Sequence, residues 1–282
     1  MSTSICILGL GLMGRPMARV LLAAGYQVRG WNRSLLSEEL TEGIPLCGDL
    51  AEAAQTKVCL LMLADSHAVN TVLAQLEPHL SPGQLVMDMG TSNPAHSRAH
   101  AWRLAAKGIG WVDAPVSGGP EGAAAGSLAI MAGGTMADFV RVRPFLEMLG
   151  SNVVRVGGPG MGHTAKIINQ LIVGLTIEAV AEALTLAEKS GLNPQLFQQA
   201  LQGGFADSKI LQIHGSRMIN RAYVPGAKAK TQLKDLRLAL DLATSASAHL
   251  PHLESAIALY EELITQGDGE LDHSALHKLL WP

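Results

Sequence analysis

The sequence predicts an α/β protein in which a doubly wound parallel β-sheet is followed by an all-helical region. Three observations predict this fold class: short runs that are apolar at every position, helical patterns that alternate with them, and only helical patterns after residue 160. Uniformly apolar runs are typical of strands buried on both faces, as in a parallel sheet covered by helices. The chain has 282 residues, and because domains usually contain about 100–200 residues, we expect two of them.

Six apolar runs are predicted as strands in the first domain, residues 1–160. They are residues 5–8, 27–31, 58–63, 85–89, 109–113 and 128–131. Clear helical patterns stand between them at residues 13–24, 66–76 and 95–107. Alternation of this kind predicts a doubly wound α/β domain.

After the glycine-rich turn at 157–162, every predicted element is a helix. The first, residues 164–189, is apolar around most of its circumference. We expect it to be about 40 Å long at ~1.5 Å per residue, joining the two domains and buried in a core or against a partner subunit. Shorter helices are predicted at residues 194–201, 208–219, 231–247, 251–266 and 274–280. They make residues 161–282 an all-α C-terminal domain.

Composition and charge exclude several classes of function. The net charge is -3, with no block of like charge, so we expect neither a nucleic-acid nor a membrane partner. The three cysteines and ten histidines show no ligand spacing, so no metal site is predicted. We recognise no secretory signal and no membrane-spanning stretch. We therefore expect a cytoplasmic protein, and the 48% hydrophobic content is enough to bury a subunit interface as well as a core.

A glycine-rich loop follows the first predicted strand and opens the first helix: Gly9-Leu10-Gly11-Leu12-Met13-Gly14. In this context the spacing of the three glycines is typical of a dinucleotide site. The first glycine allows a tight turn, the second lets the backbone approach a pyrophosphate, and the third lets helix and strand pack closely. The start of the helix then faces the phosphate charge. The loop therefore predicts a Rossmann domain that binds a dinucleotide.

The end of the second predicted strand indicates which dinucleotide. An acidic residue there would bind the ribose 2′-hydroxyl of NAD, but this chain has Asn32, Arg33 and Ser34. Arg33 can pair with a 2′-phosphate, and Ser34 can donate a hydrogen bond to it. We therefore predict a preference for NADP(H), with NAD(H) as a possible substitute. The alternative is that Arg33 is an ordinary solvated loop residue.

The strongest catalytic candidate is Lys166, near the start of the long helix. With Asn169 and Gln170 it forms an i, i+3, i+4 set on one helix face. A hydride that reaches a carbonyl carbon leaves negative charge on the oxygen, which needs a proton donor. Burial would lower the pKa of a lysine toward the range in which it can donate a proton. Neighbouring amides could orient the lysine and the substrate. The alternative is a lysine whose ammonium reaches solvent.

Two further groups are candidates. The turn Ser117-Gly118-Gly119 follows a predicted strand, at the edge of the sheet where ligands bind in such folds. Its N–H groups and hydroxyl could hold a carboxylate, although a plain Gly-Pro turn explains it equally well. The pair Lys234-Asp235 lies in a predicted C-terminal helix, where adjacent charges are most often just surface.

Four motifs, at residues 9–18, 113–119, 160–170 and 234–236, resemble those of the β-hydroxyacid dehydrogenases. This family includes the 3-hydroxyisobutyrate dehydrogenases, tartronate semialdehyde reductases and glyoxylate/succinic semialdehyde reductases, and the resemblance covers essentially the whole chain. It implies that Lys166 is the catalytic proton donor. The turn at 117–119 would hold the substrate carboxylate, helped by Asn169 or Gln170.

The resemblance also implies roles nearer the cofactor. Thr91 would lie beside the nicotinamide, and Lys234, supported by Asp235, would close the cofactor site. Two positions depart from the pattern of the family. Gly90 stands where relatives usually have Ser, and Gln170 replaces a second Asn, which leaves the amide partner of the substrate open.

Together these features predict an NADPH-dependent reductase of a short semialdehyde or 2-oxo acid, of the tartronate semialdehyde, glyoxylate or succinic semialdehyde type. The alternatives are a dehydrogenase that oxidises a 3-hydroxy acid such as 3-hydroxyisobutyrate, an imine reductase, and a cofactor-binding module without catalysis. Lys166 disfavours the imine reductases, which usually lack this lysine. The resemblance further implies a homodimer or homotetramer built around the long helix and a small carboxylate as substrate.

Overall fold

The computed structural model describes residues 4–281. The chain divides into two compact units, Met1–Lys166 and Ile167–Pro282. The division falls inside one long helix, α8 (Met161–Lys189), six residues beyond the boundary predicted from the glycine-rich turn. The two units are described in turn.

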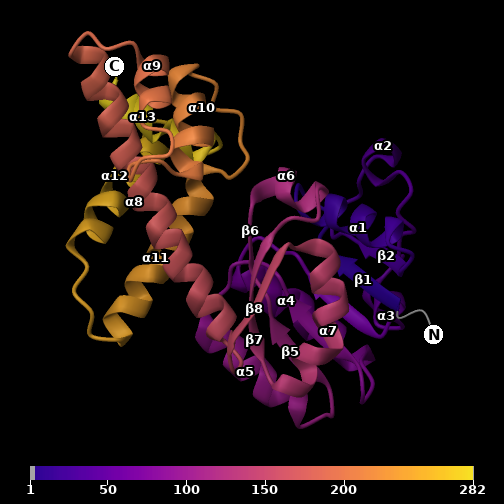
Figure 1. Cartoon of the computed structure of the whole chain (residues 1–282). Helices are drawn as coiled ribbons and strands as arrows, with labels where there is room; N and C mark the ends of the chain where they lie inside the picture. Colours follow the sequence, from indigo (N-terminus) through magenta and orange to yellow (C-terminus); the bar gives the residue numbers. More distant parts are fainter. Residues whose placement is uncertain (1–3, 282) are drawn as a thin grey trace. The chain divides into compact units, whose positions relative to one another are not determined.

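The first unit contains a parallel sheet flanked by helices (Figure 1). Its first five strands lie in the order β2-β1-β3-β4-β5, and each neighbouring pair is parallel. The strands are β1 (Ser4–Leu8), β2 (Gln27–Trp31), β3 (Val58–Leu61), β4 (Leu85–Asp88) and β5 (Gly110–Asp113); the helices between them are α1 (Gly14–Ala23), α2 (Glu38–Thr41), α3 (Leu50–Ala53), α4 (Ser66–Leu76), η1 (Glu77–His79) and α5 (Pro94–Ala105). The strand order reverses direction between β1 and β3, and such a switch point is where open α/β sheets bind ligands.

The rest of the sheet adds antiparallel pairs to the predicted doubly wound parallel sheet. It contains β6 (Val116–Ser117), α6 (Gly119–Ala124), β7 (Ala129–Gly134), α7 (Met136–Leu149) and β8 (Asn152–Gly157). β7 is antiparallel to β5 and to β6, and β8 is parallel to β7. α6 is only 6 residues long, about 9 Å at ~1.5 Å per residue. It is therefore too short to return the chain to the amino ends of the strands, as a parallel connection requires. β7 therefore starts near the edge where β5 ends.

The central strands β1, β3 and β4 are buried on both faces. Ile5 and Ile7 belong to one hydrophobic cluster, whereas Cys6 and Leu8 of the same strand belong to another. Successive side chains of a strand point to opposite faces, so a strand between two cores is apolar at every position. β8 was not predicted because it alternates between exposed and half-buried residues.

The described residues of the second unit, 167–281, form helices joined by turns, with one isolated bridge between Lys228 and Asp272 and no strand. Besides the remainder of α8 it contains α9 (Pro194–Ala200), η2 (Leu211–Gly215), α10 (Ser216–Ile219), α11 (Ala229–Ser245), α12 (Pro251–Thr265), η3 (His273–Leu276) and α13 (His277–Leu280). α8 and α11 approach closely at Gly174, where a Cβ atom would lie 2.9 Å from Leu236 Cδ2. The core of this unit is a third hydrophobic cluster, to which α8 contributes Ile167, Ile177 and Leu184.

The predicted helix at 208–219 is only partly α-helical. Residues Leu211–Gly215 form a π-helical turn before α10. The side-chain amide of Gln198 donates to the carbonyl oxygen of Leu211 at 2.7 Å. An inserted side chain that takes a helix carbonyl is a known cause of such irregular turns.

We expected no membrane-spanning stretch, and one helix among residues 4–281 passes that test by length and composition only. α8 is long and apolar enough by length and composition alone, with a mean hydropathy of 1.6 in its most apolar window, 39% of which is buried inside the chain. Its buried positions contribute to the core of the second unit.

Candidate active site

The glycine-rich loop lies between β1 and α1, at the carboxyl edge of the parallel strands. Gly9 has a φ of +107°, which glycine adopts without the steric cost of a Cβ atom. A Cβ atom on Gly14 would overlap the carbonyl oxygen of Gly9 and lie 3.5 Å from Ile7 Cγ2, so this glycine lets α1 pack closely on β1. A Cβ atom on Gly11 would meet nothing within 4 Å. That part of the loop is therefore open to a ligand.

The start of α1 is suited to an anion. Met13 occupies the N-cap position, and within residues 4–281 no side chain caps this end and no acidic residue lies in the first turn. Backbone N–H groups and the helix dipole attract a phosphate at such a terminus. Of the two remaining loop residues, Leu10 is buried in the core whereas Leu12 is half exposed. The residues present thus fit the pyrophosphate of a dinucleotide.

The end of β2 is tied to the glycine-rich loop. The Oδ1 atom of Asn32 accepts the N–H of Leu10 at 3.1 Å, and its Nδ2 donates to the carbonyl oxygen of Ser34 at 2.8 Å. Arg33 and Ser34 are exposed. Asn32 therefore shapes the turn, which presents a cationic and a hydroxyl side chain beside the loop without a carboxylate at the position after β2.

Thr91 lies in a turn that wraps around a buried carboxylate at the end of β4. Asp88 accepts the N–H of Gly90 at 3.0 Å and the hydroxyl of Ser92 at 2.9 Å. A Cβ atom on Gly90 would lie 2.8 Å from the carbonyl oxygen of Leu63. Glycine at this position therefore removes a close contact, and the turn holds Thr91 half-buried.

Asp113, at the end of β5, binds the first turn of α8. Its carboxylate accepts the N–H of Gly160 at 2.8 Å and the N–H of His163 at 3.0 Å. Burial raises the pKa of Asp113, against the opposing effects of His163 and these two N–H groups. A carboxylate at a helix N-terminus also complements the helix dipole. Asp113 therefore fixes where α8 begins.

His163 is completely buried and strengthens this anchor. Ser97 Oγ and His163 Nδ1 are 2.7 Å apart, and His163 Nε2 lies 3.6 Å from Asp88 Oδ2. The ends of β4 and β5 and helix α5 thus all contact the first turn of α8. Lys166 follows one turn later and is 7% exposed. The catalytic candidate is therefore buried on an anchored helix, which disfavours the interpretation that its ammonium reaches solvent.

The turn at 117–119 connects β6 to α6. Gly118 has a φ of +138° and Gly119 one of +67°, and side chains with a Cβ atom rarely adopt these conformations. Ser117 and Gly119 are half-buried, and Gly118 is exposed. Glycine therefore suits both positions, and the turn is partly accessible, which is compatible with a carboxylate site as well as with a plain Gly-Pro turn.

The remaining candidates lie in the second unit and contact each other. Gln170 Nε2 donates to Asp235 Oδ2 at 2.6 Å, and Asn169 Nδ2 donates to Gln170 Oε1 at 3.0 Å. The ammonium of Lys234 lies 2.9 Å from Asp235 Oδ1. Asp235 is 1% exposed, so the interpretation of this pair as ordinary helix surface was wrong for Asp235.

Sequence reasoning missed Gln232, which is 1% exposed. Its Nε2 donates to the carbonyl oxygen of Gln170 at 3.0 Å. A glutamine on the buried face of α11, one turn before the predicted pair, is the signal that could have identified it. Asp88 and Asp113 also had no role assigned, although Asp113 ends a predicted strand and Asp88 lies one residue before the end of another.

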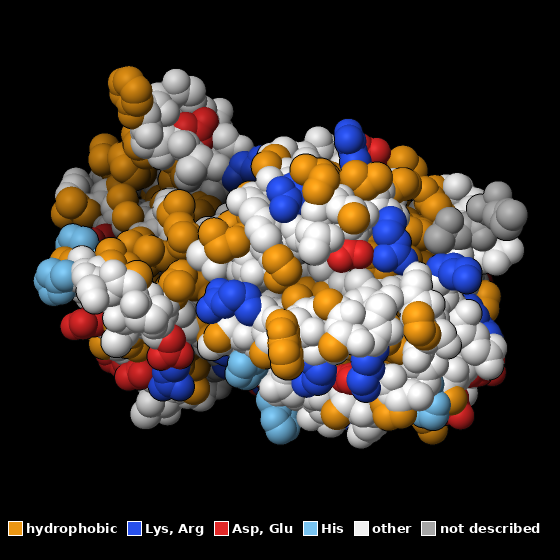
Figure 2. Space-filling view, turned by 90° about the horizontal axis from the view of Figure 1, so that it is seen from below, with side chains coloured by type: hydrophobic (Ala, Val, Ile, Leu, Met, Phe, Trp, Pro, Cys, Tyr) orange, Lys and Arg blue, Asp and Glu red, His pale blue; other side chains and the backbone are white. Residues whose placement is uncertain are grey.

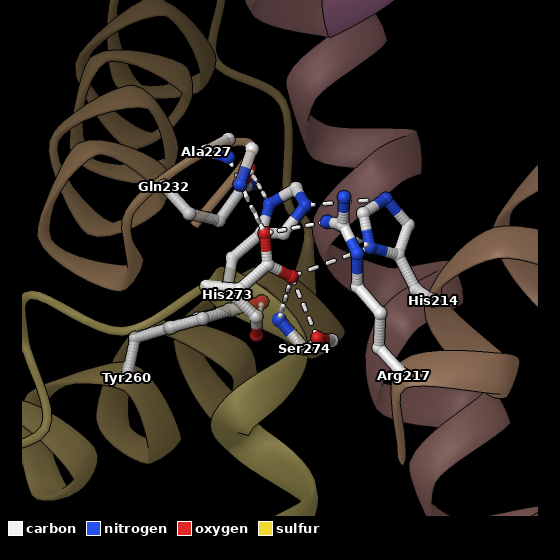
Figure 3. Close-up of polar contacts among 9 residues, drawn as sticks. His214, Arg217, Ala227, Gln232, Tyr260, His273 and Ser274 are labelled. Atoms are coloured by element: carbon white, nitrogen blue, oxygen red, sulfur yellow. Dashed lines mark hydrogen bonds and ion pairs between the residues drawn. The ribbon is translucent and has the colours of Figure 1, made fainter. Parts of the chain in front are cut away.

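Three potential metal ligands meet in the second unit. His214, Asp272 and His273 place ligand atoms within 4.8 Å of one another, which sequence spacing could not reveal. However, Asp272 is bound by the Arg217 guanidinium at 2.7 Å and by the hydroxyl of Ser274 at 2.6 Å (Figure 3). Although burial raises the pKa of Asp272, hydrogen bonds and the charge of His273 hold it well below its usual value. We call these five residues the Asp272 cluster; its arginine disfavours a metal ion.

The sheet with its switch point, the open loop at Gly11 and the uncapped start of α1 define a dinucleotide-binding protein. Residues 4–158 match the family model for the NAD-binding domain of 6-phosphogluconate dehydrogenase. Residues 160–280 match the NAD-binding model of NADP-dependent 3-hydroxyisobutyrate dehydrogenase.

Relatives of known name match over nearly the whole chain. One is 2-hydroxy-3-oxopropionate reductase of Escherichia coli, 40% identical over 97% of this chain and 95% of that protein. Another is 3-hydroxyisobutyrate dehydrogenase of Pseudomonas aeruginosa, 33% identical over 98% of each.

Solved structures agree with these matches. A 3-hydroxyisobutyrate dehydrogenase from Salmonella typhimurium superposes with a TM-score of 0.90 at 31% identity, over 99% of this chain and 100% of that one. The Mycobacterium tuberculosis enzyme, described with L-serine, has a TM-score of 0.87 at 30% identity, covering 100% of both chains. The chain belongs to the β-hydroxyacid dehydrogenase family. It is an NAD(P)-dependent oxidoreductase that acts on a hydroxy acid or its carbonyl counterpart.

Proposed function

We propose that this enzyme reduces a short semialdehyde or 2-oxo acid to the hydroxy acid with NADPH. The observation that carries the chemistry is Lys166, 7% exposed on a helix anchored by Asp113. The identity of 40% with 2-hydroxy-3-oxopropionate reductase supports a substrate of the tartronate semialdehyde type, with glyoxylate and succinic semialdehyde as the nearest alternatives.

In this proposal each group of residues has a separate role in the reaction. The nicotinamide, when bound, supplies the hydride that reduces the carbonyl carbon. Lys166 donates a proton to the carbonyl oxygen, which would otherwise carry the developing negative charge. The N–H groups and hydroxyl of the turn at 117–119 hold the substrate carboxylate, and Thr91 lies beside the nicotinamide. Lys234, held by Asp235, adds a cation that closes the cofactor site.

The preference for NADPH rests on the turn after β2. Arg33 and Ser34 are exposed beside the glycine-rich loop, and Asn32 holds the turn through its bond to Leu10. A guanidinium and a hydroxyl suit a 2′-phosphate, whereas the NAD-specific carboxylate is replaced by a neutral amide.

The second candidate is oxidation of a 3-hydroxy acid. It is favoured by the identity of 33% with 3-hydroxyisobutyrate dehydrogenase and by the TM-score of 0.90 with a second enzyme of that name. The same residues serve both directions, because Lys166 as proton donor in reduction is the base in oxidation. Imine reduction is disfavoured by the presence of Lys166.

A substrate panel tests the proposal. The purified protein is assayed for NADPH and NADH oxidation with tartronate semialdehyde, glyoxylate, succinic semialdehyde and methylmalonate semialdehyde, and for NADP+ reduction with 3-hydroxyisobutyrate. We expect the highest kcat/KM for tartronate semialdehyde with NADPH. No turnover of the first three substrates would overturn the proposal, and turnover of 3-hydroxyisobutyrate alone would establish the second candidate.

We also propose that the chain forms a homodimer or homotetramer through α8. Ile168, Ile172 and Leu186 are 48%, 60% and 69% exposed, and their spacing of 4 and 14 residues places them on one helix face. Hydrophobic side chains are also frequent on the surface in Figure 2, and large apolar patches mark interaction sites. Light scattering should give a dimer or tetramer for the native chain and a smaller species for Ile172→Asp; a monomeric native chain would contradict this.

We further propose a cytoplasmic location. Cys6, Cys47 and Cys59 are buried free thiols, which suits a reducing compartment. Cell fractionation, with recovery in the soluble cytoplasmic fraction, tests this location.

A further inference from the structure

Gln170 is held in one direction by a buried carboxylate. Its Nε2 donates to Asp235 Oδ2 at 2.6 Å, and Asp235 is 1% exposed. An ionised carboxylate only accepts hydrogen bonds. The amide nitrogen of Gln170 must therefore face Asp235, and its oxygen must face the other way.

That oxygen determines the direction of the next amide. Gln170 Oε1 accepts from Asn169 Nδ2 at 3.0 Å. Both the donor and the acceptor of the Gln170 side chain thus have protein partners, whereas among residues 4–281 the Asn169 side chain makes this one hydrogen bond, through one N–H. Asn169 lies one helical turn beyond Lys166 on α8. This arrangement favours Asn169 as the amide that meets a substrate.

Gln232 contacts both the backbone and the side chain of Gln170. Its Nε2 donates to the carbonyl oxygen of Gln170 at 3.0 Å, so its Oε1 faces Gln170 Nε2 at 3.5 Å and His273 Nδ1 at 3.3 Å. A backbone carbonyl only accepts, so this amide cannot be reversed. His273 Nδ1 must consequently carry a proton.

The other ring nitrogen of His273 contacts the rest of the Asp272 cluster. His273 Nε2 lies 3.3 Å from His214 Nε2, and His214 Nδ1 lies 3.4 Å from Asp272 Oδ1. Figure 3 draws these contacts from Gln232 to His214. The directions of the Gln232, Gln170 and Asn169 amides thus follow from the backbone carbonyl of Gln170 and from Asp235.

We propose that Asp235 and Gln232 are positioning residues that orient Gln170, and that Asn169, not Gln170, is the amide that binds the substrate. This rests on the proposed function, because it assigns the substrate contact within the same site. It also explains how a longer side chain at position 170 is compatible with the site: the extra length reaches Asp235 and does not serve the substrate.

A double-mutant cycle tests the assignment. Asn169→Ala removes a hydrogen bond to a polar or charged substrate, so kcat/KM should fall about 10- to 100-fold, mainly through KM. Gln170→Met alone should lower kcat/KM about fivefold, but less than about twofold in the Asn169→Ala background, since a residue that acts through another has no independent effect. An equal loss in both backgrounds would overturn the proposal.

Exchanging the donor and the acceptor between positions 170 and 235 distinguishes loss of this hydrogen bond from loss of folding. Gln170→Glu places two carboxylates together and should lower kcat/KM, whereas Gln170→Glu with Asp235→Asn restores a donor facing an acceptor and should recover at least about half of the native value. Failure of the double variant to recover activity while it still binds NADPH would also overturn the proposal. Gln266→Met is the matched control, because it breaks an exposed amide–carboxylate bond of 3.2 Å in the same unit and should leave kcat/KM unchanged.

The native enzyme separates the two levels of inference. If the native chain turns over none of the substrates in the panel, the proposed function fails. If it is active but Asn169 and Gln170 contribute independently, only the positioning proposal fails.

Discussion

Two glycines of the same loop should respond in opposite ways to the same substitution. A Cβ atom on Gly11 would meet nothing within 4 Å, whereas one on Gly14 would overlap the carbonyl oxygen of Gly9 and lie 3.0 Å from its carbonyl carbon. Gly11→Ala should therefore leave the unliganded protein unchanged or slightly more stable, by about 0.4–1 kcal/mol, because alanine restricts the unfolded chain. Gly14→Ala should lower the free energy of unfolding by at least about 1–3 kcal/mol, since no side-chain rotation relieves an overlap with backbone.

When NADPH is present, Gly11→Ala should be the more harmful of the two substitutions. At about 100 times its Kd, NADPH stabilises the native chain by about 2.7 kcal/mol. A methyl group on Gly11 projects into the open space where the loop meets the pyrophosphate, so Gly11→Ala should lose most of this gain. With about 2–4 °C of Tm per kcal/mol, melting curves recorded with and without NADPH can resolve both effects.

Fluorescence titration of NADPH provides the independent measurement. Native-like NADPH affinity in Gly11→Ala would show that the open space is not the pyrophosphate site. A Gly14→Ala variant with unchanged Tm would show that α1 can move away from β1, and would refute the close-packing argument.

Three other predictions concern Lys166, Arg33 and His100. Lys166→Ala should lower kcat by at least about 100-fold, as loss of a general acid does, with NADPH affinity retained in the fluorescence titration; loss of binding instead would make this lysine structural. Arg33→Ala should raise the Kd for NADPH by about tenfold or more, the worth of a charged phosphate contact, with NADH affinity unaffected, and equal losses would refute phosphate pairing. Burial, with the charge of Arg103, lowers the pKa of His100 to about 4; the folded protein then binds fewer protons than the unfolded chain, so stability is present above about pH 6.5 and lost as the pH falls toward 4. His100→Phe should make Tm less dependent on pH between about pH 6.5 and 4. An unchanged slope in that range would show that His100 does not cause the loss of stability.

The elements of the first unit could be predicted because their determinants are local. Residues 27–31 and 66–76 match β2 and α4 at both ends, since apolar runs and the cap Asp65, which accepts the N–H of Ala68, lie in the segments themselves. The chemical meaning of Gly9 and Gly14 was also local, because a turn of fixed type follows a strand.

The direction of β7 could not be predicted in this way. An apolar strand has the same pattern in either direction, and only the short connection through α6 made β7 antiparallel. The π-helical turn at Leu211–Gly215 likewise depends on Gln198, a side chain from another helix.

Among the site residues, the sequence alone identified the glycine-rich loop, the turn at Asn32 to Ser34 from which we predict a preference for NADP(H), and Lys166 as the candidate acid. Short-range patterns and residue chemistry suffice for these assignments. Only the tertiary structure decided that Asp113 anchors α8, that Asp235 is buried, and that Asp235 and Gln232 bond to Gln170. Those roles depend on hydrogen bonds between residues about 50 to 65 positions apart in the chain, and a one-dimensional pattern carries no record of which distant groups folding brings within 3 Å.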